Sequence, residues 1–125
     1  MEKHITLTAA EEKLAALIWR EAPLSSPDLV ALAQAELNWK KSTTYTVLKK
    51  LCDKSLFRNN HALVSVRLTQ DDFIAQQSRM YVEDLFGGSL PRFITAFIGG
   101  KGLSTEQAAE LKRLIDEHES EGGNG

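Results

Sequence analysis

The chain has little of what marks secreted, membrane or metal-binding proteins: among 125 residues there are one cysteine, Cys52, and three histidines. A single cysteine excludes an internal disulfide framework, and His4, His61 and His118 are too scattered for a zinc site. The sequence contains no run of about 18 apolar residues, so no membrane-spanning helix is expected. The first residues lack the apolar centre of a signal peptide. We therefore expect a soluble, cytoplasmic protein in a reducing setting, with no metal, no other cofactor and no direct membrane binding.

Enzyme signatures are also missing. The segment 99–102 is rich in glycine like a phosphate-binding loop, but Thr95 and Gly102 stand where such a loop needs glycine and Ser/Thr. No nucleophile-elbow pattern occurs, and Asp71-Asp72 is explained by the preference of acids for a helix start. The sequence therefore predicts a protein that is not an enzyme.

Charge is divided unevenly along the chain, although the net charge is only −2. Residues 1–69 hold ten Lys/Arg and seven Asp/Glu, a net of +3, whereas residues 70–125 hold five and ten, a net of −5. The window 38–67 alone is near +6, with seven Lys/Arg and one acid. The basic front half suggests an anionic partner, and the acidic rear half suggests solvent or another protein chain.

Two helices are predicted at the front of the chain. Thr8 and Glu11 have the spacing of a capping box, and apolar residues then recur at helical spacing until about Glu21. Ser26-Pro27 should begin a second helix, with proline at the first helical position, and this helix should end near Leu37-Asn38.

A third helix is predicted over residues 41–54, and its two sides differ in chemistry. Thr44, Val47, Leu48 and Leu51 should point inward, with Cys52 beside them. The outer side carries hydroxyl and amine groups that can bond base edges and phosphates in the major groove of DNA. This hydroxyl–amine face comprises Ser42, Thr43, Tyr45, Thr46, Lys49 and Lys50.

A β-hairpin should follow the third helix. Residues 56–58 and 63–68 favour strands, and Asn59-Asn60-His61 is the predicted tip because asparagine tolerates positive φ. Three helices and a hairpin form the layout of a winged helix, in which the third helix enters the major groove and the hairpin touches the flanking backbone.

Three more helices are predicted after the hairpin. One runs from Thr69 to a glycine ending at Gly87-Gly88, a short one begins at Ser89, and the last begins with a capping box between Ser104 and Gln107 and frays after Glu119. Their apolar residues exceed what such short helices bury in one chain, so we expect a homodimer. The expected interface residues are Phe73, Met80, Leu85, Phe86, Phe93, Phe97, Leu111 and Leu114.

The predicted fold is therefore mainly α with a small β-hairpin. Residues 1–69 form a winged helix-turn-helix domain that binds DNA, residues 70–119 form a helical dimerisation domain, and residues 120–125 form a disordered tail.

This chain resembles the penicillinase-repressor family, which includes antibiotic-responsive and copper-responsive members. Leu7-Thr8-Ala9-Ala10-Glu11 and Ile18-Trp19 match its first helix, and Trp39 with Thr43, Thr46, Leu48 and Leu51 matches its recognition helix. Leu85 to Leu90 matches its Phe-x-Gly-Ser-Leu turn, and Leu103-Ser104 with Glu110-Leu111 matches its last helix. The likeness covers about residues 5–118.

The resemblance implies a winged-helix transcriptional repressor that dimerises through its C-terminal helices and binds a two-fold symmetric, double-stranded DNA operator. Carried over by position, Lys40 and Lys41 join Lys49 and Lys50 in flanking the hydroxyls of the recognition helix, and Arg58 and His61 become wing contacts.

Two departures from the family concern induction. Antibiotic-responsive members are inactivated by cleavage of an Asn-Phe bond in the fifth helix, where this chain has Ala96-Phe97. If a membrane sensor protease is a partner, this bond is the candidate cleavage site. Copper-responsive members carry a cysteine-rich metal site in the C-terminal tail, where this chain has no cysteine.

Alternatives remain open from the residues alone. The lysines could form a merely solvated face, and Trp39 could pack between the second and third helices or donate to a phosphate. Cys52 is more simply a small core residue than a redox sensor, because a sensor needs an exposed site that favours the thiolate. The alternative function is a winged-helix module that binds a protein partner instead of DNA.

Overall fold

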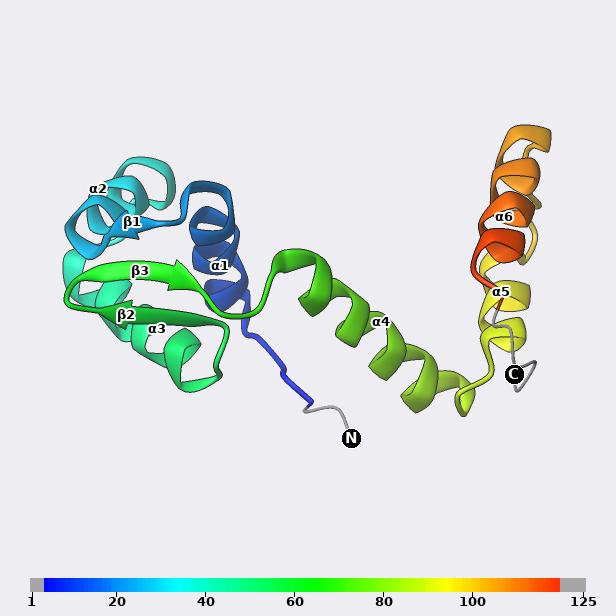
Figure 1. Ribbon diagram of the computed structural model, residues 1–125, viewed down its shortest axis with the longest axis horizontal. Helices are drawn as coiled ribbons and strands as arrows, with labels where there is room; N and C mark the ends of the chain where they lie inside the picture. Colours follow the sequence, from blue (N-terminus) through cyan, green and yellow to red (C-terminus); the bar gives the residue numbers. More distant parts are fainter. Residues whose placement is uncertain (1–3, 120–125) are drawn as a thin grey trace. The chain divides into compact units, whose positions relative to one another are not determined.

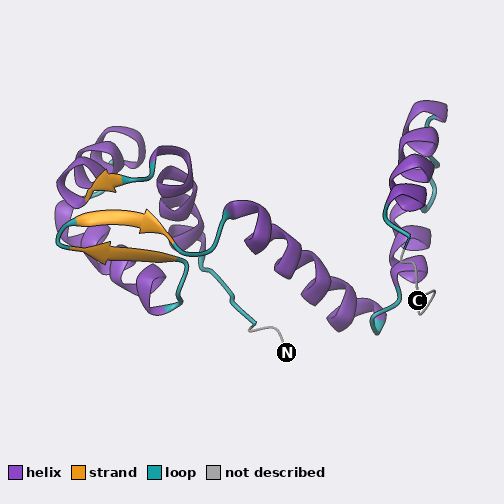
Figure 2. Ribbon diagram, viewed as in Figure 1, coloured by secondary structure: helices purple, strands orange, loops and turns teal. Residues whose placement is uncertain are grey.

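The computed structural model describes residues 4–119, which form helices and one small sheet (Figures 1 and 2). In chain order the elements are α1 (Ala9–Glu21), β1 (Leu24–Ser25), α2 (Ser26–Leu37), α3 (Lys41–Asp53), β2 (Phe57–Asn60), β3 (Leu63–Val66), α4 (Gln70–Phe86), α5 (Leu90–Ile98) and α6 (Thr105–Glu117). The predicted mainly α fold, a winged helix followed by C-terminal helices, is confirmed. The predicted disordered tail, residues 120–125, lies outside the described residues.

The helix starts follow from local chemistry. Thr8 Oγ1 accepts from the Glu11 N–H at 3.2 Å, and Glu11 Oε1 accepts from the Thr8 N–H at 2.7 Å, so the predicted capping box of α1 is confirmed. The capping box of α6 between Ser104 and Gln107 is confirmed as well. The cap of α2 is Ser25, one residue before the predicted start, because the Ser25 hydroxyl accepts from the backbone N–H of Asp28.

The sheet has three antiparallel strands in the order β1-β3-β2. The strand β1 was not predicted, because two residues have no strand signal of their own and depend on pairing with β3. Leu24 pairs with Val64, which fastens the segment between α1 and α2 to the hairpin.

The hairpin tip differs from the prediction. Asn59 and Asn60 belong to β2, where they pair with Val64 and Leu63, and the two-residue turn consists of His61 and Ala62. These two residues have φ of 52° and 63°, the signs that a type I′ hairpin turn requires. Pairing between the strands therefore outweighs the preference of asparagine for positive φ.

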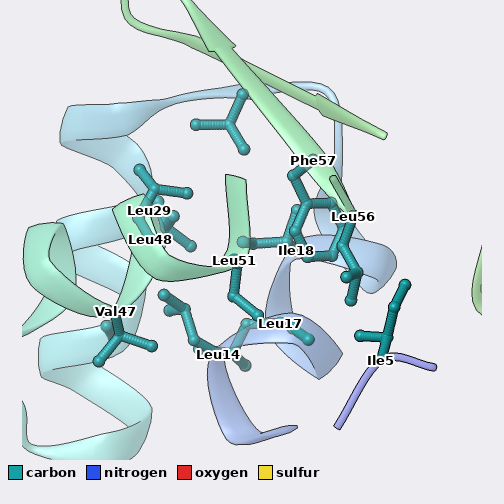
Figure 3. Close-up of a cluster of buried hydrophobic side chains, with 13 residues drawn as sticks. Ile5, Leu14, Leu17, Ile18, Leu29, Val47, Leu48, Leu51, Leu56 and Phe57 are labelled. Atoms are coloured by element: carbon teal, nitrogen blue, oxygen red, sulfur yellow. The ribbon is translucent and has the colours of Figure 1, made fainter. Parts of the chain in front are cut away.

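The core of the winged helix lies between α1, α2, α3 and the sheet. Figure 3 shows side chains from these elements converging, among them Leu14, Leu29, Leu51 and Phe57. Phe57 is 1% exposed and the three leucines are fully buried. Burial of a side chain of this size contributes about 1.5–3 kcal/mol, so this cluster holds the three helices and the hairpin together.

The described chain divides into two compact units, and the division falls inside α4, between Tyr81 and Val82. The first turns of α4 belong to the first unit. The rings of Phe73 and Trp19 lie 5.5 Å apart, and Gln77 Nε2 donates to the Ile5 carbonyl at 2.5 Å. The assignment of residues 70–119 to dimerisation stays a prediction. No helix among residues 4–119 is long and apolar enough to cross a membrane.

Glu11 combines helix capping with an ion pair. Its carboxylate is 3% exposed and accepts from Lys54 Nζ at 2.7 Å in addition to closing the capping box. Burial raises the pKa of Glu11, but hydrogen bonds from Lys54 and from the Thr8 backbone outweigh burial and leave the pKa below its ordinary value.

Glu11→Gln should therefore lower the free energy of unfolding by about 2 kcal/mol at pH 7. Because the folded pKa is lowered, the contribution is complete above the unfolded carboxyl pKa of about 4.3 and is lost as the pH falls through the folded value. Urea unfolding between pH 3 and pH 7 measures this difference. Glu12→Gln, an exposed change on the same turn, is the control, and an equal effect in both variants would contradict the assignment.

Candidate nucleic-acid interface

The helix α3 presents the predicted face outward. Thr44, Val47, Leu48 and Leu51 are buried, as predicted, and the Thr44 hydroxyl bonds to the Lys40 carbonyl within the helix. The helical repeat then leaves the opposite side free. The exposed residues on it are Lys41, Ser42, Thr43, Thr46, Lys49 and Lys50.

The lysines of this face are available to an anionic partner. Lys49 Nζ lies 3.2 Å from Asp53 Oδ2, but the side chains are 77% and 65% exposed. A pair this exposed contributes only about 0–1 kcal/mol, so a phosphate could replace Asp53 at little cost.

The beginning of α3 favours a phosphate too. Its N-cap residue is Lys40, which makes no capping hydrogen bond with its side chain, and the first turn contains no acid. The first backbone N–H groups of a helix lack partners within it and form its positive end. Lys40 and Lys41 add positive charge at the same place, and this combination suits an anion.

Lys54 has a different role from the other lysines of the basic window. Its ammonium group donates to the Thr6 carbonyl and to the Glu11 carboxylate, both at 2.7 Å. Lys54 is therefore occupied in joining the end of α3 to the segment before α1.

Tyr45 is less free than predicted. It is half-buried, and its hydroxyl donates to Ser26 Oγ at the start of α2 over 3.4 Å. The ring lies at the border between α3 and α2, so its position depends on both helices.

The wing supplies polar groups beside α3. Arg58 in β2 and His61 in the turn are exposed, as wing contacts must be. Asn59, which was predicted in the turn and not as a contact, lies in β2 and lines a groove with residues of α3. Alternate residues of a strand share a face, so Asn59 lies on the same face of β2 as the buried Phe57. The large apolar residue two positions before Asn59 is therefore the sequence signal for its orientation.

This groove connects the recognition helix with the wing. Its volume is about 430 Å³, and its walls are Tyr45, Leu48, Lys49, Cys52 and Asn59. The structure thus brings together two predicted contact residues, Tyr45 and Lys49, with one that was missed.

Cys52 and Trp39 follow their simpler interpretations. Burial and the charge of Asp53 raise the pKa of the Cys52 thiol against the opposing effect of Lys49, so the thiolate that a redox sensor needs is disfavoured. Trp39 is half-buried and packs on the core cluster. In the part of the chain that is described, no three His, Cys, Asp or Glu side chains gather into a group that could hold a metal ion.

A winged helix with a hydroxyl–amine face on its third helix and a basic wing defines a protein of the winged-helix DNA-binding class. The sequence profile of the penicillinase repressor family matches residues 7–117, and the chain belongs to this family.

Two relatives agree with this assignment over nearly their whole length. The penicillinase repressor of Bacillus licheniformis is 22% identical over an alignment that covers 96% of this chain and 97% of the relative. The penicillinase repressor of Staphylococcus aureus is 19% identical over an alignment that covers 92% of this chain and 94% of the relative. The chain is thus a DNA-binding transcriptional repressor and not an enzyme, and family membership decides against the protein-interaction module.

Proposed function

We propose that this repressor acts as a homodimer on a two-fold symmetric operator. Each protomer places α3 in the major groove and sets its wing against the neighbouring backbone. The observation that carries the proposal is the outward face of α3, where Ser42, Thr43 and Thr46 lie exposed among lysines. Arg58 and His61 contact the flanking phosphates, and the lysines fix the register on the duplex.

The C-terminal helices supply the argument for two chains. No residue of α5 or α6 is buried, although both helices carry large apolar side chains. Leu85, Leu90, Phe97 and Ile115 are between 56% and 69% exposed. Isolated helices shorter than about 12–15 residues are marginal in water, and α5 and α6 have 9 and 13 residues. This unit therefore needs a second surface to pack against.

An apolar groove on this unit fits a partner helix. It measures about 410 Å³ and lies between the ends of α5 and α6. Phe97, Leu103, Leu111 and Leu114 form its apolar wall, and Glu106, Gln107 and Glu110 form its polar edge. The ring centroids of Phe86 and Phe93 lie 5.6 Å apart, and those of Phe93 and Phe97 lie 6.1 Å apart. These aromatic contacts continue the apolar surface along α5. Among the predicted interface residues, Phe73 instead contacts Trp19 of its own chain.

Selection of bound duplexes from a random DNA library tests the proposed function. The expected result is an enriched sequence with two inverted half-sites whose centres lie about 10 base pairs, or a multiple of this, apart. Enrichment of single half-sites only would reject the dimer, and no enrichment over random DNA would reject sequence-specific binding.

Charge placed in the apolar groove should separate the protomers. Phe97→Glu with Leu114→Glu is expected to convert the dimer into a monomer at micromolar concentration, because four carboxylates would be buried at one interface. Sedimentation measures the state, and affinity for the full operator should fall by at least about 100-fold as the two half-sites become independent. Ala109→Glu adds a carboxylate at an exposed position of α6 and is the control. A doubly substituted protein that still sediments as the wild type would contradict this interface.

We also expect the Ala96–Phe97 bond to stay intact during induction. Both residues are exposed on α5, but the asparagine that precedes the cleaved bond in antibiotic-responsive members is replaced by alanine. Mass spectrometry of the protein from cells treated with a β-lactam should show only the uncut chain. A fragment ending at Ala96 would contradict this prediction and show that a protease cuts this bond.

A further inference from the structure

Ser26, which was not predicted as a site residue, lies where the two DNA-facing parts of the winged helix meet. It is the first residue of α2 and is 4% exposed. Its backbone N–H bonds to the wing, and its hydroxyl bonds to the recognition helix.

The backbone of Ser26 holds the tip of the wing. Its N–H donates to the carbonyl of Ala62, a turn residue of the hairpin, at 2.8 Å. The first N–H of a helix normally has no protein partner because no carbonyl precedes it within the helix. Here that N–H anchors the turn that carries His61.

The side chain of Ser26 meets the recognition helix. Its Oγ accepts from the Tyr45 hydroxyl over 3.4 Å, which is long for a bond between hydroxyl groups. This contact directs the Tyr45 hydroxyl toward α2. Tyr45 also lines the groove with Asn59 of the wing, so the position of its ring shapes the surface between α3 and β2.

We propose that Ser26 is a positioning residue for operator binding, which sets the wing tip and Tyr45 of the recognition helix in fixed relation before DNA arrives. Tyr45 then acts through its ring and its place in the groove, and its hydroxyl is engaged by Ser26 instead of a base or phosphate. The proposal rests on the proposed function, in which α3 and the wing contact the same duplex. Its physical basis is preorganisation, since a side chain that must be ordered on binding weakens affinity.

Operator affinity of three variants tests the side-chain contact, with a duplex obtained by library selection as the probe. Ser26→Ala and Tyr45→Phe each remove one hydroxyl and should each weaken operator binding by about two- to ten-fold. The double variant should be no weaker than the weaker single variant, because both changes remove the same contact. Losses that multiply in the double variant would overturn the proposal, as would Ser26→Ala binding with wild-type affinity.

Ser25→Ala is the matched control. It removes the neighbouring Ser25 hydroxyl, which accepts from the Asp28 N–H and caps α2. The backbone pairing of Ser25 with Leu63 of β3 does not involve this hydroxyl and is kept. It should lower stability without changing operator affinity, and an equal loss of affinity in both serine variants would overturn the positioning role. Lys49→Gln distinguishes failure of the Ser26 role from failure of the proposed DNA-binding face. If Lys49→Gln weakens operator binding and Ser26→Ala does not, only the positioning role of Ser26 is wrong. If neither variant weakens operator binding, the assigned DNA-binding face is wrong.

Amide exchange tests the backbone contact independently. The Ser26 N–H should exchange slowly, like an amide within a helix, both in the wild type and in Ser26→Ala, because the alanine variant keeps the bond to the Ala62 carbonyl. Rapid exchange of this amide in the wild type would show that the wing tip is not held by α2 and would overturn that half of the proposal.

Discussion

Glutamine at Lys40, Lys41, Lys49 and Lys50 together should weaken operator binding by at least about 100-fold near 0.15 M salt. Each phosphate contact releases condensed counterions, so the slope of log affinity against log salt should become shallower by about three to four units for each half-site. Within residues 4–119, Lys40, Lys41 and Lys50 form no ion pair, and Lys49 has only an exposed partner, Asp53. Little therefore opposes their transfer to phosphates.

Folding should survive this substitution, which makes the loss interpretable. Glutamine and lysine have similar helix propensities, and all four positions are exposed. A triple variant, Lys13→Gln, Lys101→Gln and Lys112→Gln, is the control because these exposed lysines lie outside α3. Titrations of fluorescent operator at several salt concentrations measure both effects. Equal changes of slope in the two variants would mean that general charge, and not this helix face, attracts the DNA.

The salt experiment also separates Lys54 from its neighbours. From the sequence, Lys54 counts with the basic window, but its ammonium group is held by the Thr6 carbonyl and the Glu11 carboxylate. A variant at Lys54 should therefore change stability more than the salt slope. The contrast shows that a local count of charges identifies a basic region without telling which charges are available.

Features controlled by near neighbours were predictable. The capping boxes at Thr8 and Ser104 depend on residues three positions apart, and the structure has both. The inward orientation of the Thr44 side chain and the outward orientation of the Thr43 side chain follow from the helical repeat alone. For this reason the orientation of the α3 face could be derived before any tertiary contact was known.

Features controlled by distant contacts were not predictable. The strand β1 exists because Leu24 pairs with Val64, and the turn at His61 and Ala62 follows from the register of β2 on β3. The contact between Tyr45 and Ser26 joins residues 19 positions apart. The sequence thus identified the recognition helix and the wing, but not how the fold fixes one against the other.

Trp19 makes three such distant contacts, and Trp19→Ala should lower the free energy of unfolding by about 3–5 kcal/mol. Its ring lies 5.3 Å from Phe57 of the wing and 5.5 Å from Phe73 of α4. Its indole Nε1 donates to the Leu68 carbonyl at 2.9 Å, in the link between β3 and α4. Removal of the side chain leaves a cavity and an unpaired carbonyl at the same point.

Denaturant unfolding at equal protein concentration measures this loss, because self-association makes apparent stability depend on concentration. The protein has two tryptophans, so Trp39 remains as the fluorescent reporter after Trp19 is removed. Trp19→Phe should cost about 1–3 kcal/mol, since it keeps an aromatic ring but leaves the Leu68 carbonyl without its donor. Leu63→Ala, at a side chain that is 51% exposed, should cost less than either change. If Trp19→Ala were no more damaging than Leu63→Ala, the wing and the first turns of α4 would not depend on this tryptophan, and another contact would have to hold them to the core.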